Sequence, residues 1–203
     1  MSISHLEFLV EEYSAEVLLQ QLLPKLVGDR SFVIHAHQCK DELIDRLPGR
    51  LNGYRNWLGE QGRVVVLVDR DDDDCLWLKA RLDGMAERAG ILTRSSAGGG
   101  SFHVANRIVV EELEAWYFGD WQAVRGAYPR VSAHLEWRYR DPDSISGGTW
   151  EALERVLQRA GYFEGGLRKA ELARAVGPKM VPDRNTSPSF RAFRDVVLEM
   201  AAA

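Results

Sequence analysis

The sequence has 203 residues, of which 45% are hydrophobic and 28% charged, a composition typical of a globular protein with its own core. Its longest aliphatic run, Val64–Val68, is far shorter than the roughly 20 residues of a membrane span. The N-terminus carries several glutamates and does not resemble a secretory signal peptide. Two cysteines cannot form a disulfide framework, so we expect a cytoplasmic protein that does not enter the membrane.

The charge is unevenly distributed along the chain. The net charge is −4, but residues 1–120 hold 20 acidic against 13 basic residues, and residues 121–203 hold 10 against 13. This balance excludes an overall basic footprint for nucleic acid. Any contact with phosphate therefore needs a local basic patch, a metal ion or a partner.

Strands and helices alternate through the first half of the chain. Apolar periodicity and terminator residues predict strands at His5–Glu11, Ser31–His37, Arg63–Asp69 and Ile91–Arg94, with helices from Ser14 to Gly28, Asp41 to Leu58 and Leu76 to Ala89. Ser14 is the expected N-cap of the first helix. The uninterrupted apolar run before Asp69 is typical of a strand covered on both faces.

The second half is predominantly helical. After a loop at Gly98–Gly100 we expect a strand at His103–Ile108 and helices at Val110–Phe118, 121–128, 150–161 (with Thr149 as N-cap), Leu167–Val176 and Ser189–Met200. The prediction is an α/β fold with a mostly parallel sheet flanked by helices, formed by residues 1–120. Residues 121–203 form a helical elaboration that packs on this core within a single domain.

An acidic run is the strongest chemical signal. Asp69 to Asp74 place five carboxylates within six residues at the end of the buried strand. Ligands of open α/β sheets bind at the carboxyl ends of strands, and carboxylates suit Mg²⁺ or Mn²⁺. If the strand continues, Asp69 and Asp71 share one face, and for these two we favour metal binding. For Asp72 to Asp74 we favour a solvated turn with a helix N-cap, and keep Asp73 as an additional candidate ligand.

Glu11 and Glu12 form a second acidic signal at the end of the first strand. The first and third strands of a doubly wound sheet are often neighbours, which would bring Glu11 beside Asp69 and Asp71. The alternative is that these glutamates only favour the start of the following helix. Position in the sequence leaves both interpretations open.

Five blocks in this order resemble a known family. They are FLVEEYSAEVLLQQLLPKL, VVVLVDRDDDDC, NRIVVEELEAWYFGD, GLRKAELARAV and NTSPSFRAFRDV. The glutamate followed by a distant Asp-x-Asp resembles the Toprim core of topoisomerases, primases and overcoming-lysogenization-type nucleases. The blocks together are similar to a bacterial family of Toprim-like proteins with a domain of unknown function, commonly encoded beside ABC-type ATPases in phage-defence and abortive-infection loci.

The resemblance implies roles for particular residues. Glu11 matches the Toprim glutamate, a metal ligand or general acid/base, and Asp69 and Asp71 match the metal-binding Asp-x-Asp. The family usually has Gly after the glutamate; this chain has Glu12, which becomes an additional candidate. Related nucleases hold a second metal with a later acidic residue, here Glu114 or, less favoured, Glu112; the equally weighted alternative is that these glutamates only favour the start of a helix.

Two late segments are candidates for contact with phosphate. Related nucleases have a late lysine that stabilises charge in the transition state, and Lys169 lies in a comparable segment. A solvated surface lysine is the alternative. Ser187 and Ser189 precede the last helix, whose N-terminus would bind phosphate, although both are also ordinary N-cap residues.

Two other motifs carry no function in this interpretation. His35, His37 and Cys39 alternate along one strand, but no fourth ligand is evident nearby, so we favour a structural role. No Lys-Ser/Thr follows Gly98–Gly100, so the loop is not a P-loop and ATP is not bound by that route.

The leading hypothesis is a Mg²⁺- or Mn²⁺-dependent nuclease that acts as an effector with an ABC- or SMC-type ATPase partner in anti-phage defence. Nucleic acid is the expected substrate, and a homo-oligomer stays open. The alternative is a non-catalytic subunit that keeps the Toprim fold and binds or regulates the ATPase. The modest basic content and the change to Glu12 both keep that alternative open.

Overall fold

We describe residues 3–203 from a computed structural model. Its sheet has the order β2-β1-β3-β4, and all pairs are parallel. The strands are β1 (His5–Val10), β2 (Ser31–Ala36), β3 (Gly62–Asp69) and β4 (Val104–Val109). The expected pairing of the first and third strands is confirmed, because β1 lies beside β3 with Val10 opposite Leu67.

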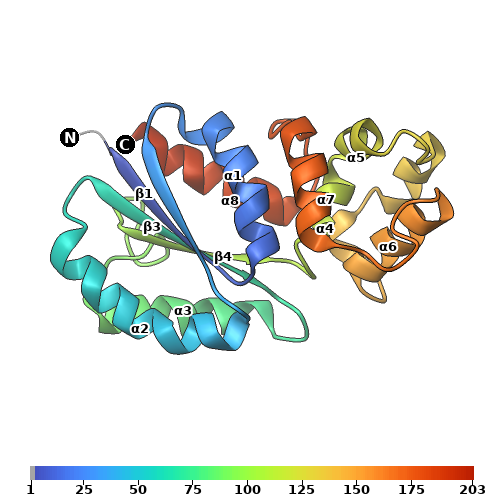
Figure 1. The fold of residues 1–203 in the computed structure, drawn as a ribbon. Helices are drawn as coiled ribbons and strands as arrows, with labels where there is room; N and C mark the ends of the chain where they lie inside the picture. Colours follow the sequence, from blue (N-terminus) through green and yellow to red (C-terminus); the bar gives the residue numbers. More distant parts are fainter. Residues whose placement is uncertain (1–2) are drawn as a thin grey trace.

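Helices cover both faces of the sheet, as Figure 1 shows. They are α1 (Tyr13–Val27) and α8 (Pro188–Ala202) on one face, and α2 (Lys40–Trp57) and α3 (Cys75–Arg88) on the other. Every residue of β3 is buried, which explains why its sequence is continuously apolar instead of alternating. The two faces therefore carry two separate hydrophobic clusters.

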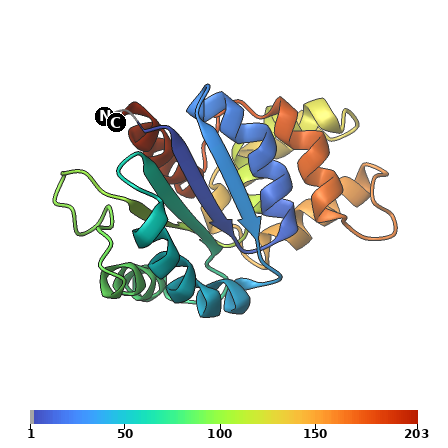
Figure 2. The ribbon, with the colours of Figure 1, turned by 60° about the vertical axis from the view of Figure 1, so that its left-hand side comes forward.

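Further helices lie beyond the carboxyl ends of the strands (Figure 1). They are α4 (Glu114–Gly119), α5 (Trp121–Ala127), α6 (Thr149–Arg159) and α7 (Lys169–Val176), with 3₁₀ segments η1 (Ala133–Tyr139), η2 (Pro142–Ser144) and η3 (Gly177–Lys179). Figure 2 shows α7 beside α1, and the two helices are in contact. One hydrophobic cluster runs from β1 through α1 into these helices.

Four local expectations are wrong. The segment Ile91–Arg94 is not a strand; it makes only one isolated bridge, from Thr93 to Val104, because the turn after α3 continues directly into a loop. The helix expected at Val110–Phe118 begins only at Glu114, since Glu111 has a φ of 66° and interrupts the helical backbone. The expected caps are displaced by one or two residues: Glu12 precedes α1, and Gly148 precedes α6.

No helix within residues 3–203 is long and apolar enough to cross a membrane. Cys39 and Cys75 are both free thiols.

Candidate metal and phosphodiester site

The candidate site begins where β1 and β3 end side by side. Glu11 is the first residue after β1, and Asp69 is the last residue of β3. A Glu11 Oε2 atom accepts a hydrogen bond from the backbone N–H of Asp69 at 3.0 Å. The parallel pairing of the strands therefore brings together two acidic residues that are 58 positions apart.

Glu114 adds a third carboxylate from the start of α4. Its side chain is fully buried, and neither carboxylate oxygen has a hydrogen-bond partner among the described residues. Asp69 is held from the same side, because its Oδ2 accepts a hydrogen bond from the Leu113 N–H at 3.3 Å. A buried carboxylate without hydrogen bonds is costly, so Glu114 is held here at the expense of stability.

The three carboxyl groups have raised pKa values. Burial, followed by the charges of Glu11 and Glu114, holds the pKa of Asp69 well above its ordinary value. Burial raises the pKa of Glu114 to about 7, although the nearby charge of Lys169 opposes the shift. Burial also raises the pKa of Glu11. Such a group of carboxylates disfavours its own ionisation and is the electrostatic setting in which a cation binds.

Lys169 lies beside this group and is not a freely solvated surface lysine. Its Nζ is 3.5 Å from Glu12 Oε1 and 3.8 Å from Glu114 Oε2. Burial alone would lower the pKa of Lys169, but Glu114, Glu12 and Asp69 raise it above its ordinary range. Lys169 thus keeps its positive charge at neutral pH. The start of α7 supplies this lysine because α7 packs against α1.

Asp71 and Asp73 are held by a lysine that the sequence analysis did not single out. Lys40 Nζ lies 2.6 Å from Asp71 Oδ2 and 2.9 Å from Asp73 Oδ2, and also donates to the backbone oxygens of Asp69 and Arg70. The strand ends at Asp69, and Asp71 has a φ of 49°, so the two do not alternate on one strand face as expected. The charge of Asp71 still contributes to the raised pKa of Glu11.

Arg70 does not lie between the carboxylates. Its guanidinium pairs with Glu111, the residue with positive φ in the segment between β4 and α4. Arg70 therefore pairs with Glu111 and not with Asp69, its neighbour in the sequence.

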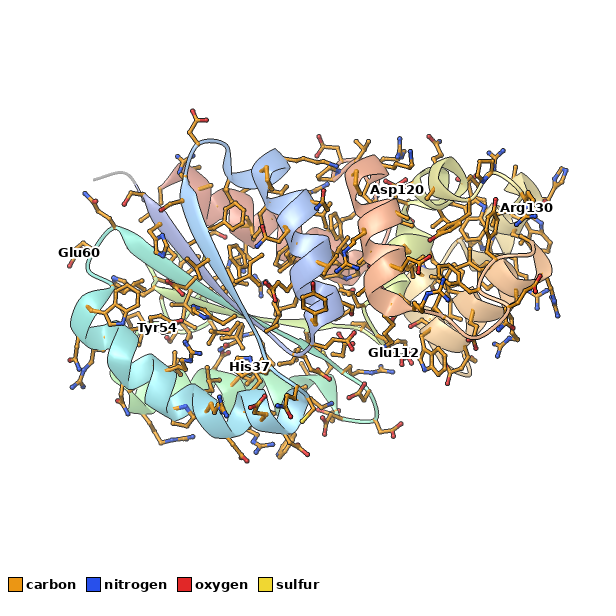
Figure 3. All side chains as sticks on the ribbon, in the orientation of Figure 1. His37, Tyr54, Glu60, Glu112, Asp120 and Arg130 are labelled. Carbon is orange, nitrogen blue, oxygen red and sulfur yellow. The ribbon has the colours of Figure 1, made fainter. Side chains whose placement is uncertain are left out.

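Glu112, the less favoured candidate for a second metal, has a structural role in this structure. Its Oε2 accepts hydrogen bonds from Thr149 N (3.0 Å), Thr149 Oγ1 (2.9 Å) and Trp150 N (3.0 Å). The carboxylate therefore holds the N-terminus of α6, where the helix dipole favours an anion. Figure 3 labels Glu112, which precedes α4 in the chain, and Asp120, which follows it.

At the N-terminus of α8, where phosphate binding by Ser187 and Ser189 is the expectation, the structure places the carboxylate of Asp143. Ser187 Oγ donates to Asp143 Oδ1 at 2.6 Å, and the Ser189 N–H donates to Asp143 Oδ2 at 2.7 Å. Ser187 Oγ also accepts from the Phe190 N–H, so the N-cap interpretation is confirmed for this residue. Ser189 accepts from Trp116 Nε1 at 3.1 Å.

A buried glutamate outside the site was missed by sequence reasoning. Glu7 is almost fully buried on β1, and its carboxylate contacts His5 at 2.8 Å, His35 at 2.6 Å and Tyr54 at 3.1 Å. The His37 ring contacts the Val10 carbonyl. The structural interpretation of His35 and His37 is therefore confirmed. The i, i+2 spacing of His5 and Glu7 was the available signal.

The donor set fits a divalent cation, although its ligands are not gathered in advance. Glu11, Asp69 and Glu114 offer hard oxygen atoms, and both Glu114 oxygens lack a partner. Within residues 3–203, no three His, Cys, Asp or Glu side chains are grouped closely enough to hold a metal ion as placed. Binding would therefore require rotation of these side chains.

Together, the four-stranded parallel sheet and the helices on both of its faces define an α/β protein. The chain belongs to the family described as Domain of unknown function (DUF4276), whose model matches residues 10–198.

Two solved structures are similar in fold. The C-terminal region of the Burkholderia pseudomallei OLD protein has a TM-score of 0.50 at 14% identity and covers 99% of this chain and 100% of that one. The C-terminal region of the Xanthomonas campestris pv. campestris OLD protein, phased with platinum, has a TM-score of 0.48 at 15% identity, with 98% and 94% covered. No curated protein matches the sequence.

Proposed function

We propose that the chain is a Mg²⁺- or Mn²⁺-dependent nuclease that cleaves phosphodiester bonds. The observation that carries this proposal is the fully buried Glu114, whose carboxylate oxygens have no hydrogen-bond partner among the described residues and which lies beside Asp69. An apolar residue at position 114 would make the protein more stable, because a buried carboxylate without hydrogen bonds is costly. Departures of this kind from the rules of stable packing are typical of functional sites.

In this proposal each residue has a distinct task. Glu11, Asp69 and Glu114 would hold the ion, which when bound supplies Lewis-acid activation of the phosphodiester. Lys169 stays protonated and stabilises negative charge that builds on the phosphate. Glu12 holds Lys169 in place from the start of α1. Lys40 fixes the turn after β3, with Asp71 and Asp73 as additional ligands if they leave that lysine.

The proposed partner is an ABC- or SMC-type ATPase, with which the nuclease acts as a defence effector. Support comes from the family resemblance and from the similar structure of the Burkholderia pseudomallei OLD protein, which is the C-terminal region of that protein and is matched over 100% of its length. A unit of this fold thus occurs covalently joined to a further N-terminal part in that OLD protein.

A second candidate function is a non-catalytic subunit that binds or regulates the ATPase. It is favoured by the lysines of the chain: Lys40 pairs with Asp71 and Asp73, and Lys169 lies near Glu12 and Glu114. In such a subunit Lys40 and Lys169 would neutralise the carboxylates permanently, as a bound metal ion does in a nuclease.

The test is the substitution Asp69→Asn, with Asp72→Asn as a matched control in the same acidic run. We expect Mn²⁺ to raise the melting temperature of the wild-type chain and of Asp72→Asn, but not of Asp69→Asn. Cleavage of single-stranded and duplex DNA and RNA should be lost only in Asp69→Asn. A wild-type chain whose melting temperature does not respond to Mn²⁺ or Mg²⁺ would support the non-catalytic subunit. Full cleavage by Asp69→Asn would exclude the proposed site.

A further inference from the structure

An exposed tyrosine stands at the edge of the carboxylate site. Tyr13 is the first residue of α1 and follows Glu11 and Glu12 directly, and 55% of its surface is exposed. Consecutive Cα atoms are about 3.8 Å apart, so the backbone position that carries the Tyr13 ring is next to the one that carries the Glu12 carboxylate. Burial in the core does not explain an aromatic residue here, because most of its surface faces solvent.

Arg174 from α7 lies against this ring. Its guanidinium carbon is 5.8 Å from the centre of the Tyr13 ring, and its Nη2 donates to the Tyr13 hydroxyl at 2.9 Å. Among the described residues, Tyr13 is the only side-chain partner recorded for Arg174. The neighbouring Arg168 is paired with Glu171 instead. Arg174 therefore forms no salt bridge among the described residues, although the charge of Glu171 lies near it, and it stands on the same helix as Lys169.

This pair offers what the acidic site lacks. Carboxylates repel a phosphate backbone, and a nucleic-acid strand near them needs a cation and a second source of attraction. An exposed aromatic ring provides this second source of attraction, since every nucleobase has a face that can stack on such a ring. A base inside a duplex already stacks on its neighbours, so only an unpaired base is free to do so.

We propose that Tyr13 and Arg174 form a nucleotide-binding pair that selects single-stranded nucleic acid. The Tyr13 ring stacks on an unpaired base next to the cleaved phosphodiester, and Arg174 contacts the phosphate of that nucleotide. This inference rests on the proposed nuclease function and specifies its substrate as an unpaired strand.

The test measures binding separately from cleavage. Binding of a fluorescent single-stranded oligonucleotide and of a matched hairpin duplex is measured at low salt with a chelator present, so that no cleavage occurs. The variants are Tyr13→Leu, which removes the ring; Tyr13→Phe, which keeps it; and Arg174→Gln. Trp57→Leu is the control, because Trp57 is similarly exposed, at 61%, but lies at the end of α2.

We expect Tyr13→Leu to weaken single-strand binding about tenfold, as the loss of one base–aromatic stack does, with little change for the duplex. Tyr13→Phe should retain most of the affinity, Arg174→Gln should reduce the salt dependence of binding, and Trp57→Leu should bind as wild type. In Mn²⁺, Tyr13→Leu should lose its preference for single strands while it still cleaves.

Other outcomes would overturn the inference. Equal effects of Tyr13→Leu on single strand and duplex, or no effect on either, would show that the pair only connects α1 to α7, as would a lowered melting temperature with unchanged binding. No binding of any oligonucleotide by the wild-type chain would also overturn it. By contrast, strand binding that depends on Tyr13 without any Mn²⁺-dependent cleavage would support the inference and contradict the proposed nuclease.

Discussion

At the scale of single residues, Glu114 combines full burial with carboxylate oxygens that accept no hydrogen bond from the described residues. Its nearest cation, Lys169, lies 3.8 Å away and faces Glu12 as well. The buried hydroxyl of Tyr117, one helical turn further along α4, also lacks a hydrogen-bond partner among the described residues. These polar atoms form a buried region that is electrostatically unfavourable when no cation is bound.

The raised pKa of Glu114 predicts how stability changes with pH. The folded state holds the Glu114 proton up to about pH 7, whereas the ordinary value is 4.5. The stabilising contribution is therefore complete below pH 4.5 and is lost as the pH rises toward 7. Its size is about 3 kcal/mol. The raised pKa of Asp69 acts in the same direction.

The measurement is a series of thermal melts between pH 4.5 and 8 in the presence of a chelator. Glu114→Gln removes the titrating group, so its melting temperature should decrease less over this range than that of the wild-type chain. Identical pH profiles for both proteins would mean that Glu114 is ionised throughout and that its burial has no electrostatic cost.

At the scale of elements, the acidic run after β3 divides into residues with different tasks. Asp74 is the N-cap of α3, and its carboxylate accepts from the Trp77 N–H at 2.7 Å. Asp72 is exposed in the turn. We predict that Asp74→Ala lowers the free energy of unfolding by about 1 kcal/mol, and that Asp72→Ala changes it little. Denaturant unfolding of the two variants checks this, and equal effects would contradict the capping role.

Glu112 allows a second prediction at this scale. Because three donors from the first turn of α6 converge on one Glu112 oxygen, Glu112→Ala should destabilise the protein by about 2–4 kcal/mol. The rise in melting temperature on addition of Mn²⁺ should stay as in the wild type. If Glu112→Ala instead abolished the response to Mn²⁺ at unchanged stability, Glu112 would be a metal ligand after all.

The positions of strand ends were predictable from the sequence, and with them part of the site. Glu11 and Asp69 follow apolar runs that need burial on both faces, and parallel strands place their carboxyl ends together. The roles of Lys40 and Glu112 were not predictable in this way. Each depends on how a helix start meets a loop far away in sequence: Lys40 contacts Asp71, and Glu112 contacts Thr149. No local periodicity encodes such contacts.

At the scale of the whole molecule, the last helix returns to the sheet. Phe193 of α8 is fully buried against Phe8 of β1, with ring centres 6.3 Å apart, and against Trp116 of α4 at 5.1 Å. The helix periodicity of residues 189–200 predicted α8 itself, but an amphipathic pattern does not state which surface it covers. The face of the sheet that α1 leaves open is thus completed by the end of the chain.

This arrangement predicts that residues 1–120 do not form an independent unit. Without α8, one face of β1 and β4 would expose apolar side chains to water, and a fragment of residues 1–120 should show no cooperative thermal unfolding by circular dichroism. In the full chain, Phe193→Ala should cost about 3–5 kcal/mol, a large fraction of the stability of a typical domain. Leu198→Ala, on the exposed side of the same helix at 41% exposure, is the matched control and should have little effect. A fragment of residues 1–120 that unfolds cooperatively would show instead that the sheet needs only α1, α2 and α3, and that α8 belongs with the helices beyond the strand ends.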